Sequence, residues 1–248
     1  GSSNAGTQTA TITFGGANGS PLNYTNVITE SYNGTNWTEV NDLNTGRSYL
    51  SGSGTGTAAL AIGGYFGNPG NATNVEQWNG TNWTAVNALN TNGKQSSAAA
   101  GTSTASIVYG GFNYGIPGPD NKTELWNGTN WTEVNDLNTA RYYLSGNGTS
   151  TAAIGAGGEV SGYVANTEEW NGTNWTNKAN MNQARNALSA FGTSTDFYAA
   201  GGNPGFSVNT EKWNGSSWTE QNNLNTGRAT SAASGSATAG LYFGGQNP

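Results

Sequence analysis

Cysteine and histidine are both absent from the 248-residue chain. Their absence excludes disulfides, thiolate and imidazole metal ligands, cysteine nucleophiles and histidine general bases. Charged residues make up only 9% of the chain and the formal net charge is -6, so there is no basic stripe of the kind that binds phosphates. These shortages argue against catalysis, against a bound metal or other cofactor, and against nucleic acid as a partner.

Long apolar runs and helical periodicity are also missing. No stretch approaches the roughly 18 to 20 consecutive apolar residues of a membrane-spanning helix, so we expect no membrane insertion. Aliphatic residues are sparse, but nine Trp and eleven Tyr are present. Each such ring can bury roughly 150–250 Å², and the length suits one all-β domain over residues 1–248.

The strongest signal is an internal repeat marked by aromatic pairs. A tryptophan recurs every 43 to 48 residues, and another aromatic residue stands five positions before each copy. The pairs are Tyr32 and Trp37, Trp78 and Trp83, Trp126 and Trp131, Trp170 and Trp175, and Trp213 and Trp218. The text between them is Asn-Gly-Thr-Asn or Asn-Gly-Ser-Ser, which favours a tight hairpin turn because both Asn and Gly tolerate positive φ.

A second marker is a glycine pair that closes a short alternating segment. The pairs lie at 15–16, 63–64, 110–111, 157–158, 201–202 and 244–245. Apolar residues alternate with mostly small ones before each pair, and this period of two is typical of a strand. Each repeat therefore predicts four strands: one after a basic residue, one ending at the glycine pair, and two flanking the Asn-Gly turn.

Four-stranded repeats of this length are what a β-propeller requires. The glycine pair, a Glu two residues before an aromatic (Glu76 and Trp78, for example), the turn and the later Trp together resemble the kelch family over nearly the whole chain. The resemblance extends to the central domain of galactose oxidase, whose copper site uses histidine and a tyrosine–cysteine crosslink. That activity cannot carry over to a chain without His and Cys.

Strand counting gives a five-bladed propeller with one surplus strand. The chain is expected to begin at a second strand (residues 9–16) and to finish at another (residues 237–245). We therefore predict that the ring closes through one blade shared between the N- and C-termini. The expected state is a closed monomer, with a strand-mediated oligomer as the alternative because an unpaired edge recruits strands.

Charged residues recur once per repeat. Basic residues open the first strands and a Glu lies in each third strand, which favours structural ion pairs between strands or blades over a ring of catalytic groups. The expected members are Arg47, Lys94, Arg141, Arg185 and Arg228, with Glu30, Glu76, Glu124, Glu168 and Glu211.

Candidate ligand-binding residues lie on the loops between second and third strands, which differ between repeats while the remaining text is nearly constant. Strand alternation places these loops and the fourth-to-first connections on one face, where propellers usually carry recognition. The candidates there are Tyr24, Tyr65, Phe66, Phe112, Tyr114, Tyr163 and Phe206. Tyr49, Tyr142 and Tyr143, near the starts of first strands, are expected to line the central channel on the same face.

Two functions follow from this pattern. The first is a non-enzymatic binding or adhesion module that recognises a glycan or a protein surface through the variable loops, located outside the cell or on a virion or cell surface. The alternative is a structural spacer or assembly module of a larger viral or bacterial surface protein, in which the surplus strand joins partners.

Overall fold

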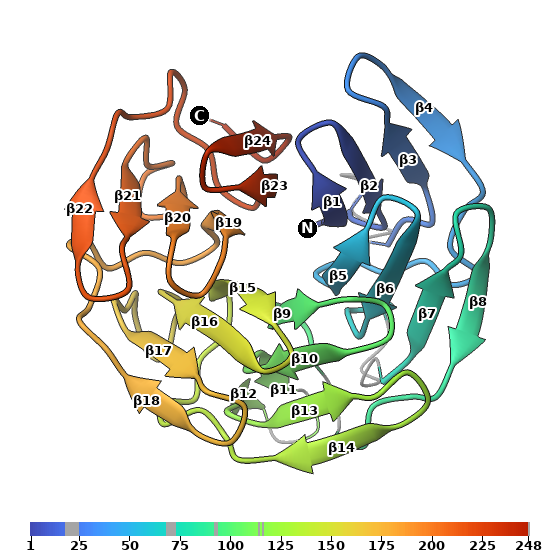
Figure 1. Cartoon of the computed structure of the whole chain (residues 1–248), viewed down its shortest axis with the longest axis horizontal. Coiled ribbons are helices and arrows are strands. Elements are labelled where there is room, and N and C mark those ends of the chain that lie inside the picture. Colours follow the sequence, from blue (N-terminus) through green and yellow to red (C-terminus); the bar gives the residue numbers. More distant parts are fainter. Residues whose placement is uncertain (18–24, 68–72, 92–93, 114, 116, 248) are drawn as a thin grey trace.

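The computed structural model describes residues 1–17, 25–67, 73–91, 94–113, 115 and 117–247. The described chain contains strands and no helix. It forms five four-stranded antiparallel sheets arranged as the blades of a β-propeller, which confirms the fold predicted from the repeats (Figure 1).

The five blades follow one another along the chain. Blade 1 comprises β1 (Ser3–Thr7), β2 (Ala10–Phe14), β3 (Thr29–Tyr32) and β4 (Trp37–Val40). Blade 2 comprises β5 (Ser51–Thr55), β6 (Ala58–Ile62), β7 (Val75–Trp78) and β8 (Trp83–Val86). Blade 3 comprises β9 (Ala98–Gly101), β10 (Ser106–Tyr109), β13 (Thr123–Trp126) and β14 (Trp131–Val134), and the small hairpin β11 (Phe112–Asn113) and β12 (Gly118–Pro119) lies within its connection. Blade 4 comprises β15 (Ser145–Thr149), β16 (Ala152–Ala156), β17 (Thr167–Trp170) and β18 (Trp175–Asn177), and blade 5 comprises β19 (Ser189–Gly192), β20 (Phe197–Ala200), β21 (Thr210–Trp213) and β22 (Trp218–Glu220).

Ring closure differs from the expectation of a blade shared between the termini. An additional first strand, β1, precedes the segment expected to open the chain, so blade 1 is built entirely from the N-terminal region. At the other end, β23 (Ala232–Ser236) and β24 (Ala239–Phe243) pair with each other and, within the described part of the chain, with no further strand; they occupy a sixth position between blades 5 and 1 (Figure 1). We call this two-stranded sheet the half-blade.

The composition of the first strands, which are the innermost strands of the blades, explains why the sequence pattern does not predict β1. They surround the central channel, a polar cavity of about 210 Å³ lined mostly by Ser, Gly and Ala. Space near the axis is limited: a Cβ atom on Gly146 of β15 would collide with the buried Tyr109 hydroxyl of the neighbouring blade. The Ser-Asn-Ala-Gly-Thr text of β1 is therefore suitable for an inner strand, although it lacks the apolar alternation by which strands are recognised.

The core consists of four hydrophobic clusters, one between each successive pair of blades. Tryptophans of the outer hairpins pack on aromatic residues of the preceding blade: the ring centroids of Trp83 and Phe14 are 4.8 Å apart, and those of Trp175 and Tyr109 are 4.6 Å apart. The recurring aromatic residues thus fill the spaces between blades, as predicted.

The fourth-strand tryptophan also makes a hydrogen bond between blades. The indole Nε1 atoms of Trp83, Trp175 and Trp218 each donate to a third-strand threonine hydroxyl at 3.0–3.1 Å. In the pair formed by blades 2 and 3, the threonine position is occupied by Val75, and the buried Trp131 Nε1 has no partner among the described residues. The chain thus leaves one buried donor unsatisfied at this position.

Replacing Val75 with threonine is expected to stabilise the protein. The new hydroxyl would accept from Trp131 Nε1, and satisfying a buried donor is worth about 1 kcal/mol. Urea denaturation would measure the change in the free energy of unfolding.

The Trp131→Phe background provides the matched control, because it removes the indole donor and leaves the new hydroxyl unpaired. There Val75→Thr should destabilise. Equal effects of Val75→Thr in the two backgrounds would contradict the assigned hydrogen bond.

The glycine pair joins adjacent blades through the backbone. The second glycine donates its N–H to the carbonyl of the basic residue that precedes the next blade, as in Gly64 to Lys94 (2.9 Å) and Gly158 to Arg185 (2.8 Å). These two glycines have φ values of 101° and 111°, which side chains disfavour. The recurrence of the pair is therefore a requirement of blade-to-blade contact.

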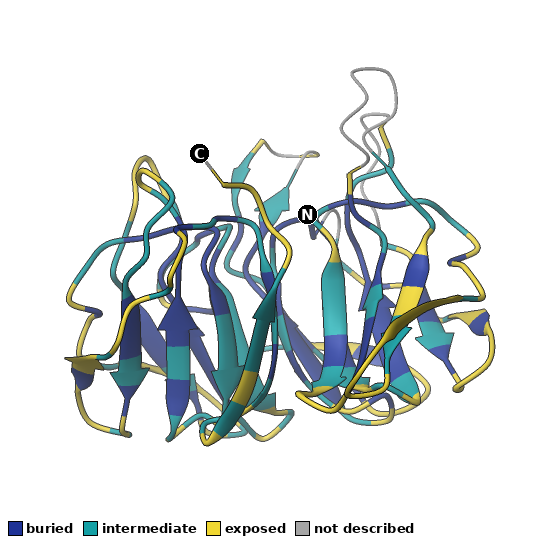
Figure 2. Ribbon diagram, turned by 90° about the horizontal axis from the view of Figure 1, so that it is seen from above, coloured by how far each residue is buried: buried dark blue, intermediate teal, exposed yellow. Residues whose placement is uncertain are grey.

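The two faces of the ring differ as the strand alternation predicted. The tight turns within hairpins lie on one face, and the longer connections and both termini lie on the other, which we call the loop face (Figure 2). In a typical tight turn, Asn79 Oδ1 accepts from the backbone N–H groups of Thr81 and Asn82 at 2.9 Å. The constant spacing of the outer hairpins from repeat to repeat thus has a local structural cause.

Candidate functional site

The recurring charged residues form buried pairs within blades. In blade 5, Arg185 Nη2 lies 2.8 Å from Glu211 Oε1, and Arg185 Nη1 donates to the carbonyls of Gly201 (2.8 Å) and Asn209 (2.7 Å). The other carboxylate oxygen of Glu211 accepts from the backbone N–H of Asn182 at 2.7 Å. The arginine and the glutamate thereby connect the inner strand, the glycine pair, the third strand and the linker between blades.

The same arrangement is present in two other blades. Arg47 pairs with Glu76 at 3.1 Å, and Arg141 contacts Glu168. All three arginine side chains are fully buried. Burial lowers the pKa of Arg47 and Arg185, and the paired glutamates oppose that shift. The structural pairing expected from the sequence is therefore present at Arg47, Arg141 and Arg185.

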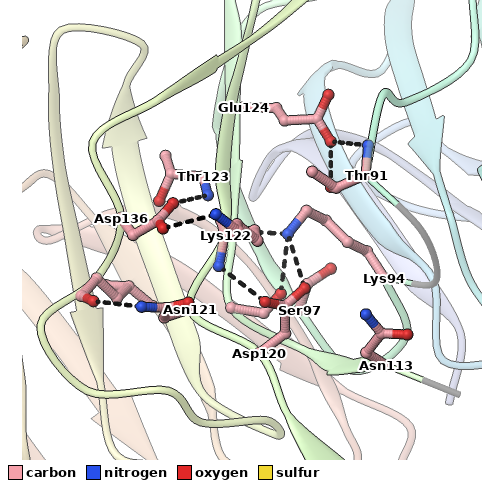
Figure 3. A network of polar contacts seen from close by, with 12 residues as sticks. Thr91, Lys94, Ser97, Asn113, Asp120, Asn121, Lys122, Thr123, Glu124 and Asp136 are labelled. Atoms are coloured by element: carbon pink, nitrogen blue, oxygen red, sulfur yellow. Dashed lines mark hydrogen bonds and ion pairs between the residues drawn. The ribbon is translucent and has the colours of Figure 1, made fainter. Parts of the chain in front are cut away.

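Blade 3 departs from this pattern (Figure 3). The buried Lys94 Nζ lies 3.7 Å from Asp120 Oδ2 and donates to the carbonyl of Lys122 at 2.7 Å, whereas Glu124 accepts from the Thr91 hydroxyl at 2.5 Å. Burial lowers the pKa of Lys94, and Asp120 opposes that shift. The expected Lys94–Glu124 pair is thus replaced: Lys94 pairs with Asp120, and Glu124 Oε1 accepts from the N–H and the hydroxyl of Thr91.

Glu30 and Arg228 also differ from the expectation. Glu30 lies exposed on β3 of blade 1 and forms no ion pair with any described residue. Arg228 precedes β23 of the half-blade, where the described residues provide no third strand and no carboxylate partner. The structure thus pairs neither of them.

On the loop face, the entrance of the channel has a regular backbone frame. Residues just before each inner strand have φ values of 51–54°: Tyr49, Ser96, Tyr143, Ala187 and Thr230. Each donates its N–H to the preceding member at 2.8–2.9 Å, and Tyr49 donates to the Gly1 carbonyl at 2.7 Å. This series of backbone hydrogen bonds runs around the entrance and fixes the Cα positions from which the side chains project.

Aromatic side chains gather on one part of this entrance. The ring centroids of Tyr49 and Tyr143 are 5.9 Å apart, those of Tyr143 and Tyr142 are 5.2 Å apart, and those of Tyr142 and Phe112 are 5.3 Å apart. All four residues are half-buried. Four of the predicted candidates therefore form one continuous group, which we call the aromatic cluster.

Polar groups continue the aromatic cluster toward blade 5. Tyr142 and Glu159 exchange two backbone hydrogen bonds (3.1 and 2.8 Å), and Asn186 Nδ2 donates to Glu159 Oε2 at 2.5 Å. Burial raises the pKa of Tyr142, and the neighbouring carboxylate raises it further, so the hydroxyl stays protonated as a donor. Asn186 Oδ1 is buried and has no partner among the described residues. Aromatic faces, a carboxylate and an amide thus lie side by side.

The other candidates lie outside this group. Tyr65 pairs through its backbone with Ser48 on blade 2, and Phe66 and Phe206 are half-buried on the connections of blades 2 and 5. Tyr163, 45% exposed, pairs through its backbone with Glu159 and so stands beside the polar groups. Tyr24 and Tyr114 lie outside the described residues.

Sequence reasoning did not select Glu159 and Asn186 as binding residues. Glu159 directly follows a glycine pair, at the position that holds Tyr65, Phe112, Asn203 and Gln246 in other repeats. Asn186 directly follows a basic residue, at the position that holds Ser48, Gln95, Tyr142 and Ala229. The two positions pair across each blade, as in the bridge of Tyr142 with Glu159. The residue at each of these two positions differs between repeats, whereas the flanking sequence is nearly constant. This difference is the sequence signal that could have indicated Glu159 and Asn186 as binding residues.

Comparisons with known proteins found no matching family model and no matching curated protein. No helix long and apolar enough to cross a membrane was found among the described residues. Within the same residues, no group of three or more metal-ligating side chains was found.

Proposed function

We propose that the protein is a non-catalytic recognition module that binds a glycan at the loop face. The observation that carries the proposal is the continuous row formed by the aromatic cluster, Glu159 and Asn186. Aromatic rings provide apolar faces for the C–H face of a sugar, and their polar ends can hydrogen-bond. The carboxylate accepts from sugar hydroxyls, and the amide oxygen offers a further acceptor.

The frame around the row supports recognition by a pre-formed surface. Tyr49 and Tyr143 are attached to the hydrogen-bonded backbone of the channel entrance, and Tyr142 and Glu159 are held by a bridge across blade 4. A ligand would therefore meet side chains whose attachment points are already ordered, which reduces the entropic cost of binding.

A glycan array followed by calorimetry with the best-binding oligosaccharide tests this proposal. Tyr142→Ala should weaken binding at least tenfold, because it removes the ring that lies between Phe112 and Tyr143 in the row, together with its hydroxyl. Tyr142→Phe should have an intermediate effect, because it keeps the ring and removes only the hydroxyl.

Phe206→Ala is the matched control, since Phe206 is an aromatic residue of the equivalent connection in blade 5 and lies outside the row. It should leave affinity within about twofold. Failure of every glycan to bind, or binding that Tyr142→Ala does not change, would contradict glycan recognition. Binding of a protein surface lost in the Tyr142→Ala variant would assign the row to a protein partner.

We also propose that the repeats are of the kelch type and that the protein acts outside the cell or on a virion or cell surface. Glycine pairs, Glu-x-aromatic segments and later tryptophans, which serve blade contacts and buried ion pairs in this structure, support the kelch relationship. The cysteine-free composition rich in Asn, Thr and Gly supports an exposed location.

A further inference from the structure

A small pocket opens at the channel entrance beside the aromatic cluster. It has a volume of about 100 Å³ and is lined by Tyr49 and Tyr143, which both belong to the cluster. Leu50, Leu144 and Leu188 line this pocket and also the central channel, so they form the boundary between the two spaces. The row proposed for glycan binding therefore leads into a recess at one end.

The volume of the pocket limits the size of the group that can enter it. One water molecule takes up roughly 30 Å³ in the liquid, so the pocket has room for about three atoms other than hydrogen. A whole pyranose ring is several times larger than this space. The pocket is therefore suited to a short substituent of a sugar whose ring stays outside.

The side chains that line the pocket are uncharged. Among the described residues they are Tyr, Leu, Ala, Ser and Thr, without a carboxylate, ammonium or guanidinium group. An ionic substituent would lose its hydration there and gain no counter-charge from a side chain. The leucines favour an apolar end on the entering group, and the hydroxyls favour a neutral polar end.

Ser96 provides a hydroxyl that lacks a partner. Its N–H donates to the Tyr49 carbonyl and its carbonyl accepts from the Tyr143 N–H, both at 2.8 Å. Its Oγ is buried and has no hydrogen-bond partner among the described residues. The hydroxyls of Ser97 and Thr230, which line the same pocket, are hydrogen-bonded within the protein at 2.7 Å. A carbonyl oxygen in the pocket would thus provide the acceptor that the Ser96 hydroxyl lacks.

We propose that the pocket receives the acetyl group of a 2-acetamido sugar, an N-acetylhexosamine, while the ring of that sugar lies on the aromatic cluster. The methyl group would face the leucines, and the carbonyl oxygen would accept from Ser96. A hydroxyl or hydroxymethyl group has no apolar end, and a methyl group alone has no acceptor. This inference rests on the glycan binding proposed above and names the class of sugar.

A glycan array tests the preference directly. Oligosaccharides of N-acetylglucosamine and N-acetylgalactosamine are printed beside the glucose and galactose oligosaccharides that carry a 2-hydroxyl instead. We expect the chain to bind acetylated members. Calorimetry with the best-binding acetylated glycan and its 2-hydroxyl counterpart should show at least tenfold tighter binding of the acetylated one.

The repeats suggest two pocket variants whose backbone conformation already occurs in the chain. Ser96→Ala removes the hydroxyl, and Ala187 has nearly the same left-handed φ at the equivalent position. It should weaken binding of the acetylated glycan about fivefold, the value of one hydrogen bond. Ala187→Tyr fills the pocket, and Tyr49 and Tyr143 show that this backbone accepts tyrosine. It should bring the affinities for the two glycans within about twofold of each other.

Ser48→Ala is the matched control for Ser96→Ala. The Ser48 Oγ is also buried without a partner among the described residues, but Ser48 does not line the pocket. Its replacement should leave both affinities unchanged. A loss equal to that of Ser96→Ala would contradict the contact assigned to Ser96.

The outcomes separate this inference from glycan recognition itself. Equal binding of acetylated and 2-hydroxyl glycans would overturn the inference and leave the aromatic cluster as a glycan site. A preference for the acetyl group that survives both Ser96→Ala and Ala187→Tyr would also overturn it, because the acetyl group would then lie elsewhere. Binding to no glycan on the array would overturn both proposals.

Discussion

Replacing Arg185 with alanine is expected to lower the free energy of unfolding by about 3–5 kcal/mol, because it leaves the buried Glu211 carboxylate without its counter-charge. The change also removes donors to the carbonyls of Gly201 and Asn209, which connect the glycine pair to the third strand. For a domain of this size, the corresponding fall in Tm is roughly 6–20 °C. Thermal and urea denaturation would measure it.

Arg228→Ala is the control, because Arg228 occupies the equivalent position of the half-blade and no described carboxylate pairs with it. It should cost less than about 1 kcal/mol, since only one exposed hydrogen bond is lost. Comparable losses from the two substitutions would show that the buried pair is not the source of the effect. Binding of the glycan proposed for the aromatic cluster should be unchanged in both variants.

Trp175→Ala should have a similarly large effect. The indole is only 6% exposed, packs on Tyr109 of the preceding blade and donates to the Thr123 hydroxyl. Removing a large buried aromatic side chain leaves a cavity and costs about 3–5 kcal/mol. The free energy of unfolding in urea provides the measurement.

The equivalent substitution Trp37→Ala is the comparison. Trp37 is 37% exposed beside the half-blade, so its removal should cost only roughly 1–2 kcal/mol. If Trp37→Ala proved as damaging as Trp175→Ala, the interface between blade 1 and the half-blade would have to be as well packed as those between complete blades.

The outer hairpins of the blades were predictable from sequence because their structure is determined by residues that are close together in the chain. The Asn-Gly turn fixes each outer hairpin, and the aromatic residues flanking it fall at the same place in every repeat, so Trp83 and Trp175 were placed correctly in the core. The pairs at Arg47, Arg141 and Arg185 followed from recurrence once per repeat.

The inner strand β1 and the polar part of the site were not predictable in the same way. Ser3–Thr7 is read as a strand only when the limited space around the channel is known, because small residues carry no apolar period. Glu159 and Asn186 meet only because blades 4 and 5 are adjacent, and neither residue belongs to a motif. Contacts between variable positions on different blades can be predicted only when the arrangement of the blades in the ring is known.

At the channel entrance, the backbone conformation is the same whichever side chain it carries. Tyr49, Ser96, Tyr143, Ala187 and Thr230 share nearly the same left-handed φ and the same hydrogen bond, although their side chains range from methyl to phenol. A left-handed backbone in non-glycine residues costs about 1–3 kcal/mol at each position, and here it is maintained regardless of the side chain. Individual substitutions at these five positions can therefore change the chemical character of the channel entrance without remodelling the backbone that carries it.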